Sequence, residues 1–260
     1  MKINEKILWA GKNRYHFAVT DSTNEQAKRL AWKGACHGTL VTADSQTNGK
    51  GRRGRTWESE ESNGIYMSLI LKPDILPEHA SMLTLVAALS VSTAIKKQLK
   101  NDNSIPYIKW PNDIVMNQKK ICGILTEMEL KQNDIAHIIV GIGININQQH
   151  FPKEISTASS IFLETGQNLQ KEELTQEILK CFEEDYATFL KTQDLKGLKK
   201  EYEALLINKN KQVTVLEPKG NWEGTALGIT NKGELIVDAE NECRYVSSGE
   251  VSVRGVYGYV

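Results

Sequence analysis

The stretch GTLVTADSQTNGKGRRGRTWESEESNGIYMSLIL, residues 38–71, decides how this chain folds and where a ligand could bind. Residues 38–43 and 65–71 are apolar and bounded by turn residues, so they predict two strands. Between them lies a basic loop, residues 45–57, with four cations, three glycines and no acid. Glycine lets a backbone approach a ligand closely, and arginine carries a permanent charge that fits carboxylate and phosphate oxygens. The pattern suits a loop that wraps a small polyanion.

The basic loop has several other possible interpretations. An Arg/Gly run can also be a solvated loop or a nucleic-acid patch, but the whole chain balances 32 Lys and Arg against 32 Asp and Glu. Gly49, Gly51 and Gly54 fit the dinucleotide fingerprint, yet no helix pattern opens on them. A phosphate-binding P-loop would need Ser or Thr where Gly51 stands. The loop alone leaves the small-anion site and the solvated loop open.

Composition limits the class of protein. A chain of 260 residues can hold one large domain plus a small one, and 40% hydrophobic with 25% charged residues is ordinary soluble composition. No apolar run approaches the roughly 20 residues that span a bilayer, and residues 1–6 lack the apolar core of a signal peptide. The five histidines show no metal-binding spacing, so no metal held by the protein alone is expected. Isolated cysteines indicate a reducing cytoplasm; they are Cys36, Cys122, Cys181 and Cys243.

Hydrophobic periodicity predicts an α+β fold. Ser22-Thr23-Asn24-Glu25 has the capping-box pattern and should open a helix through about residue 33. Pro77 and Glu78 should begin a long helix with one apolar stripe. Further helices are expected over 174–189 and 195–207, and further strands over 15–19, 107–110, 114–116, 121–129 and 135–146. After residue 210, five short strands in about 50 residues imply a small barrel. The expected domains are residues 1–209 and 210–260.

Three more segments contain residues that could bind a ligand or take part in a reaction. Lys109-Trp110-Pro111-Asn112-Asp113 could place an amide and a carboxylate beside a magnesium-nucleotide, although plain turn chemistry explains it better in isolation. Lys120 directly precedes an apolar strand, so its ammonium is expected to meet an anion, whereas Lys119 is expected to be solvated. The glycine-rich run 141–147 indicates either close approach of a ligand or a bulge. Asn145, within this run, could read a base edge.

Together these segments resemble the biotin protein ligases. The resemblance rests on Ser22-Thr23-Asn24, the loop from Gln46 to Trp57, residues 109–113, 120–123 and 141–147, Ala158-Ser159-Ser160 with Thr165-Gly166, and Gly249-Glu250-Val251-Ser252-Val253-Arg254. It spans most of the chain. It implies a mixed-sheet catalytic domain of the biotin/lipoate ligase type, followed by a small SH3-like β-barrel.

The resemblance also implies an activity. Biotin and magnesium-ATP would give biotinyl-5′-AMP, and the biotinyl group would pass to one lysine of a biotin carboxyl carrier protein. Arg52 and Lys120 would be the catalytic residues, at the carboxylate and bridging phosphate. The implied biotin-binding residues are Ser22, Thr23, Asn24, Gln46, Lys50, Gly51, Arg52, Lys120 and Gly123. The implied nucleotide-binding residues are Arg53, Arg55, Trp57, Asn112, Asn145 and Arg254, with Mg²⁺ arriving with ATP near Asn112.

Two departures from the family pattern bear on function. Lys50 stands where many members carry arginine, so its charge survives without the bidentate fork, and adenylate retention could weaken. Only 21 residues precede Ser22, too few for the DNA-binding module of bifunctional members, so no nucleic-acid partner is expected. Neither is a membrane partner. An exposed sheet edge could pair in a homodimer. The alternatives are a lipoate or octanoate ligase of the same fold family, and a non-catalytic biotin-sensing protein.

Overall fold

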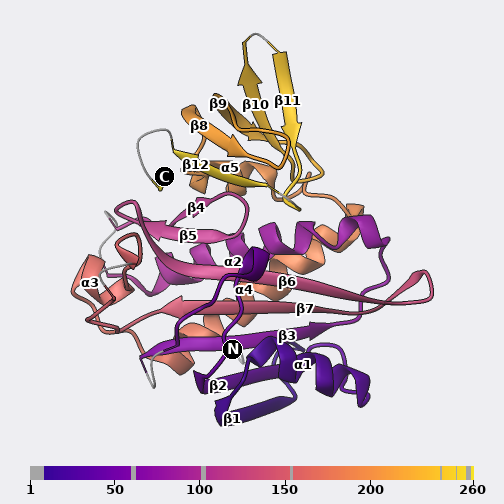
Figure 1. The fold of residues 1–260 in the computed structure, drawn as a ribbon. Coiled ribbons are helices and arrows are strands. Elements are labelled where there is room, and N and C mark those ends of the chain that lie inside the picture. Colours follow the sequence, from indigo (N-terminus) through magenta and orange to yellow (C-terminus); the bar gives the residue numbers. More distant parts are fainter. Residues whose placement is uncertain are drawn as a thin grey trace, which may run out of the picture.

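A computed structural model describes residues 9–59, 63–100, 104–152, 155–240, 242–249, 251–255 and 259–260. Expectations for residues 1–6, for part of the turn after the basic loop and for Glu250 lie outside these residues. The described chain forms a large mixed sheet with helices, and a small antiparallel sheet formed by the C-terminal part of the chain (Figure 1). The predicted α+β class is confirmed. The division at residue 210 stays a proposal.

The large sheet has seven strands in the order β1-β2-β3-β7-β6-β5-β4. Its strands are β1 (Arg14–Thr20), β2 (Leu40–Gln46), β3 (Gly64–Leu71), β4 (Tyr107–Lys109), β5 (Asp113–Met116), β6 (Lys119–Lys131) and β7 (Asp134–Asn145). β1 and β2 are parallel, whereas the remaining neighbours are antiparallel. β6 and β7, which correspond to the strands predicted over 121–129 and 135–146, form a hairpin that Lys131 and Asp134 close.

Helices cover both faces of this sheet (Figure 1). They are α1 (Thr23–Trp32), α2 (Met82–Gln98), α3 (Ile161–Thr165), α4 (Lys171–Thr192) and α5 (Lys199–Leu205). Strand side chains alternate between faces, so Leu40 and Val140 join the main core with α2 and α4, while Val41 and Ile139 pack with Ala27 of α1. α1 packs mainly on β2, β3 and β7, and the polar cleft opens on the same face beside its first turn.

Several helix predictions need correction. Ser22 is the N-cap of α1, but its side chain makes no capping hydrogen bond. Pro77–His79 forms a separate 3₁₀ turn, and α2 begins only at Met82. α2 is also buried almost all round rather than along one stripe, because it lies between the sheet and α4. α5 begins four residues later than predicted, and the short α3 was missed.

The segment Pro77–Gln98 is long and apolar enough to cross a membrane by length and composition. This corrects the expectation that no segment approaches that length. Within the fold, however, 78% of its most apolar window is buried, as for the core helix of a folded domain.

The small sheet has the order β11-β10-β9-β8-β12. Its strands are β8 (Lys211–Leu216), β9 (Trp222–Ile229), β10 (Leu235–Ala239), β11 (Glu242–Val246) and β12 (Ser252–Gly255). All its pairings are antiparallel, and the architecture is consistent with the predicted SH3-like domain. It packs beside β4 and β5 of the large sheet (Figure 1), so β12 lies next to the Lys109–Asp113 turn.

Candidate active site

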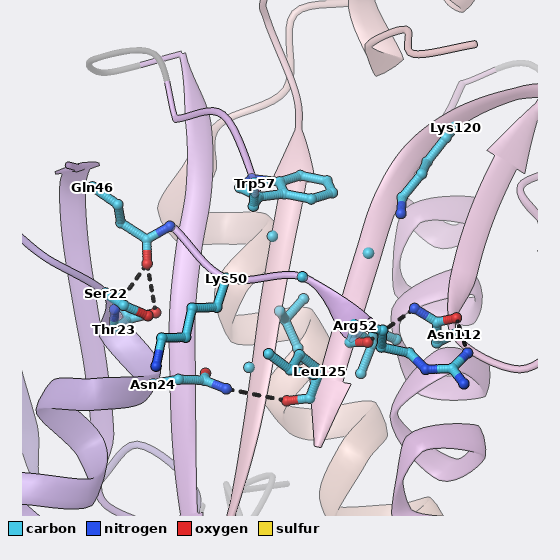
Figure 2. Close-up of a pocket in the computed structure, with 16 residues that line it drawn as sticks. Ser22, Thr23, Asn24, Gln46, Lys50, Arg52, Trp57, Asn112, Lys120 and Leu125 are labelled. Carbon is cyan, nitrogen blue, oxygen red and sulfur yellow. Dashed lines mark hydrogen bonds between the residues drawn. The ribbon is translucent and has the colours of Figure 1, made fainter. Parts of the chain in front are cut away.

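A polar cleft opens on the α1 face of the large sheet, beside the N-terminus of α1. The space between its walls amounts to about 450 Å³, counted together with its open mouth. The basic loop, the first turn of α1, β6 and β7 form its walls (Figure 2). Its lining residues are Ser22, Thr23, Asn24, Gln46, Lys50, Gly51, Arg52, Trp57, Asn112, Lys120, Gly123, Ile124, Leu125, Gly141, Ile142 and Gly143.

Hydrogen bonds connect the end of β2 to the first turn of α1. The Gln46 side-chain oxygen accepts from the backbone N–H of Thr23 at 2.8 Å and from its hydroxyl at 3.2 Å (Figure 2). The Gln46 amide nitrogen donates to Ser59 at 2.9 Å. One side chain thus joins the helix start to the segment after the basic loop, and lines the polar end of the cleft with amide and hydroxyl groups.

Three glycines explain how side chains come so close to β6 and β7. Gly123 and Gly143 are direct partners across the two strands, and a Cβ on either would lie within 2.8 Å of the Trp57 indole. A Cβ on Gly141 would lie 2.0 Å from Asn24 Oδ1. The predicted close approach in the glycine-rich run is therefore made here by side chains of the chain itself. Gly123 lines the polar cleft, and its expected contact with biotin stays a prediction.

A second, cationic cleft adjoins the first. The space between its walls, counted with its open mouth, amounts to about 660 Å³. Six cations and one carboxylate belong to its lining, which consists of Gly51, Arg52, Arg53, Arg55, Thr56, Trp57, Lys109, Trp110, Pro111, Asn112, Asp113, Lys120, Ser252, Val253, Arg254 and Tyr259. Such a concentration of positive charge in a concave site favours an anionic ligand. The small domain supplies one wall, which includes the predicted Arg254.

Arg52 connects the basic loop to both domains. Its guanidinium donates to Asn112 Oδ1 at 2.9 Å (Figure 2) and to the Val251 carbonyl at 3.3 Å. It also donates to the Ser248 carbonyl. Burial lowers the pKa of Arg52 from its ordinary value, but a guanidinium remains charged under any physiological condition. The loop is thereby fastened over the junction of the two clefts.

Among the residues that the structure describes, Asp113 is the only acid that lines the two clefts, and it organises two lysines. Lys120 Nζ lies 2.6 Å from Asp113 Oδ1, so the anion expected beside Lys120 is a carboxylate of this chain. Burial would raise the pKa of Asp113, but the charges of Lys120 and Lys109 outweigh it and hold that pKa below its ordinary value. Burial lowers the pKa of Lys109 to about 8, against the opposing effect of Asp113. The carboxylate therefore stays ionised between two ammonium groups.

Asn145 departs from its expected position. It lines neither cleft, its Nδ2 donates to the Ser159 carbonyl at 3.0 Å, and its Oδ1 accepts from Gln148 at 3.4 Å. Its amide therefore holds the segment after β7 in place, and the geometry gives no support for base recognition. The other predicted site residues line one cleft or both.

Some site residues were missed or undervalued by sequence reasoning. Lys109 and Asp113 were noticed but assigned to a turn, because the pairing of Asp113 with Lys120 across β5 and β6 is not visible in the sequence. Tyr259 was not singled out at all. The Glu25 carboxylate lies 2.6 Å from Lys50 Nζ. The sequence pointed to Glu25 only as part of the capping box at the start of α1.

Among the described residues, no group of three or more His, Cys, Asp or Glu side chains is placed to hold a metal ion. Asn112 and Asp113 provide side-chain oxygens in the lining of the cationic cleft. A single carboxylate with substrate phosphates is the kind of environment that Mg²⁺ accepts. Mg²⁺ near Asn112 stays a prediction.

Comparison with known proteins gives the family. Residues 16–145 match the biotin/lipoate A/B protein ligase family, and residues 210–254 match the biotin protein ligase C-terminal domain. The bifunctional ligase/repressor BirA of Bacillus subtilis is 37% identical over 246 residues, which cover 94% of this chain and 74% of BirA. The chain belongs to the biotin protein ligase family.

Other relatives agree with this assignment. A biotin protein ligase structure from Aquifex aeolicus, in complex with biotin and ATP, superposes with a TM-score of 0.80 at 33% identity and covers 94% of this chain and 99% of that one. The biotin–[acetyl-CoA-carboxylase] ligase of Mycobacterium tuberculosis is 27% identical over 96% of this chain and 93% of its own length. Membership in the biotin protein ligase family suggests which substrates the two adjoining clefts would bind.

Proposed function

We propose that this chain is an ATP-dependent ligase that activates biotin as biotinyl-5′-AMP and transfers the biotinyl group to a lysine of a biotin carboxyl carrier protein. The observation that carries the proposal is the junction of the two clefts. Both are lined by Gly51, Arg52, Trp57, Asn112 and Lys120. An acid in one cleft and a nucleotide in the other would meet at the two cations of this junction.

The polar cleft suits biotin. Its inner end presents the side chains of Ser22, Thr23 and Gln46, which can donate to and accept from the ureido ring. Leu125 and Ile142 supply apolar surface beside them. A ligand held in this way would direct its carboxylate toward the junction.

The cationic cleft suits ATP. Arg53, Arg55, Lys109 and Arg254 would surround the polyphosphate with positive charge. Of these cations, Lys109 is held by the Val253 carbonyl before the nucleotide arrives. Mg²⁺ bound with the nucleotide would neutralise part of the phosphate charge, with Asn112 and Asp113 as the neighbouring protein oxygens. Trp57 lies at the junction and could pack beside adenine once it leaves the glycines of β6 and β7.

The first step joins two anions, and the chain supplies the opposing charge. The biotin carboxylate attacks the α-phosphorus, the bond to the bridging oxygen breaks, and pyrophosphate leaves. Arg52 and Lys120 would lie beside the forming acyl–phosphate bond and lower the barrier through electrostatic stabilisation and positioning. Asp113 would keep the Lys120 ammonium at its place through their 2.6 Å contact.

The second step passes the acyl group to an amine. The neutral ε-amine of the carrier lysine attacks the acyl carbon, AMP leaves with the bonding electrons, and the amine loses its proton. A mixed anhydride hydrolyses when water reaches it, so the basic loop would close over the intermediate until the carrier docks. The carrier domain is therefore the expected protein partner, as the name of the Mycobacterium tuberculosis relative implies for that enzyme.

The proposal also covers the cellular location and the assembly of the protein. Cys36, Cys122, Cys181 and Cys243 are all free, which fits a reducing cytoplasm. A homodimer, and the absence of nucleic-acid and membrane partners, stay predictions. β1 is an edge strand of the large sheet, so it offers one surface where a second copy could pair.

A pyrophosphate-release assay tests the proposal. We expect release with ATP and biotin but not with lipoate or octanoate, and we expect carrier protein to become labelled on lysine. Release with lipoate in place of biotin would favour the lipoate ligase alternative. No release with either acid, despite measurable biotin binding, would leave only a biotin-sensing role.

A further inference from the structure

The C-terminal tyrosine reaches into the cationic cleft. Tyr259 OH donates a hydrogen bond to Asp113 Oδ2, and the Tyr259 ring centroid lies 4.4 Å from Lys109 Nζ. The end of the chain folds back on β12, since a Cβ on Gly255 would lie 2.1 Å from the Val260 carbonyl. A residue near the chain end is thus held among the groups that the proposed function uses.

The position of Tyr259 completes the bonding of Asp113. Lys120 Nζ and Asn112 Nδ2 contact Asp113 Oδ1 at 2.6 and 3.1 Å, and Tyr259 supplies the donor for the other oxygen. A carboxylate with donors on both oxygens has one preferred orientation, because rotation would break charge-assisted hydrogen bonds. Burial raises the pKa of Tyr259, so the hydroxyl keeps its proton and acts as a donor.

The ring of Tyr259 has a separate effect on Lys109. The Lys109 ammonium donates to the Val253 carbonyl at 2.8 Å and faces the aromatic ring, a contact that stabilises a cation with little access to water. Lys109 as a whole residue is only 5% exposed. Tyr259 therefore helps to keep this cation in the wall of the cleft.

Resting on the proposed function, we infer that Tyr259 is a positioning residue for adenylation. Its hydroxyl fixes Asp113, and Asp113 in turn fixes the Lys120 ammonium at the junction of the clefts. Its ring holds Lys109 toward the polyphosphate. Tyr259 itself touches neither biotin nor the reacting atoms in this arrangement.

The first test separates the hydroxyl from the ring. Tyr259→Phe keeps the ring, so we expect kcat for biotinyl-5′-AMP formation to fall about tenfold, the usual range for a lost hydrogen bond to a charged group. The KM for biotin should change less than about twofold, since Tyr259 does not line the polar cleft. Tyr259→Leu should show the same loss in kcat and, in addition, a raised KM for ATP.

A matched control and a coupling test complete the design. Tyr245 is a tyrosine of the same small domain with 61% exposure, and Tyr245→Phe should leave all constants unchanged. In single-turnover measurements with excess enzyme, adding Tyr259→Phe to an Asp113→Asn enzyme should slow it less than twofold. Both changes remove the same chain of contacts, from the Tyr259 hydroxyl through Asp113 to Lys120.

The possible results separate the inference from the proposed function. Wild-type enzyme without biotin-dependent pyrophosphate release would contradict the proposed function itself. An active wild type with an unchanged Tyr259→Phe variant would contradict only the positioning role. Faster turnover or a lower KM for ATP in Tyr259→Phe would also overturn it, and would show that the C-terminus obstructs the nucleotide. If the rate losses of Tyr259→Phe and Asp113→Asn multiply fully in the double variant, Tyr259 does not act through Asp113.

Discussion

At the scale of single residues, the site depends on charges held in fixed positions by other side chains. Lys120 and its neighbour Lys119 show the contrast. Lys120 is paired with Asp113 at 2.6 Å and lines both clefts, whereas the Lys119 side chain is 53% exposed and lies 3.7 Å from Glu164. Two adjacent lysines therefore have different expected roles.

Replacing these lysines provides a first prediction. Lys120→Ala should lower the rate of adenylate formation about 100-fold or more, the scale for losing a preorganised charge at the transition state. Lys119→Ala should leave the rate within about twofold, because an exposed pair contributes little. Pyrophosphate release measures both. Near-normal turnover of a folded Lys120→Ala enzyme would remove Lys120 from the mechanism.

Arg52 supports a second prediction. Arg52→Ala removes the hydrogen bonds to Asn112 and to the Ser248 and Val251 carbonyls, so the basic loop should close less firmly. We expect free biotinyl-5′-AMP to leak into solution about tenfold faster in the absence of carrier, as for a lost charge-assisted hydrogen bond. Chromatography of the released product measures this. Arg244→Ala, an exposed arginine of the small domain, is the control, and equal leakage from the two variants would contradict the role.

At the scale of elements, most strands and helices could be predicted from the sequence because their apolar periodicity is strong. β6 and β7 lie within a few residues of their predicted bounds, and the small sheet has the five strands predicted after residue 210. Site contacts were harder to foresee. Lys120 and Asp113 lie on different strands, Arg52 reaches the small domain, and the Asn145 amide is used by Ser159, none of which follows from local pattern.

The contact between α1 and β7 provides a third prediction. Asn24 lies against Gly141, and its amide donates to Glu127 at 2.8 Å and to the Leu125 carbonyl at 3.3 Å. Gly141→Ala would push Asn24 out of these bonds, so unfolding free energy should fall by about 1–3 kcal/mol. Denaturant unfolding measures it. Gly249→Ala has open space around the new methyl group and should change stability by much less, so equal losses would count against the packing argument.

The basic loop gives a fourth prediction. Arg53 and Arg55 are exposed in this structure, so trypsin should cleave there in the free protein. Biotin with ATP should slow cleavage, because loop closure would cover the backbone. Lys131, in the exposed turn of the β6–β7 hairpin, offers an internal control that ligand should not protect. Mass spectrometry of the fragments reads both sites, and equal protection or equal cleavage at both would contradict loop closure.

At the scale of the whole molecule, stability should depend on a carboxyl group far from the clefts. Asp185 lies between α4 and α2, where it accepts from Ser90 at 2.7 Å, and burial raises its pKa from 3.8 to about 6. The unfolded chain therefore ionises Asp185 at lower pH than the folded one. Between about pH 4 and 6 the folded state binds more protons, so this group lowers stability as pH rises and the full cost remains above pH 6.

Asp185→Asn tests this dependence. The variant should be more stable than wild type at pH 7 by about 1–3 kcal/mol, at 1.36 kcal/mol per pKa unit, and the gain should vanish near pH 4. Urea unfolding at the two pH values measures it. Asp134→Asn, at the exposed start of β7, is the control and should give no such difference. A gain that is the same at both pH values would contradict the assignment to Asp185 ionisation.

The central claim for the whole enzyme is that a basic loop and a partly buried ammonium jointly neutralise and enclose an acyl phosphate. A crystal structure with bound biotinyl-5′-AMP tests it most directly. We expect the Arg52 guanidinium and the Lys120 ammonium within hydrogen-bond distance of the oxygens at the acyl–phosphate bond, with residues 49–55 closed over it. If both side chains lie away from that bond while the ligand fills the two clefts, the account is wrong.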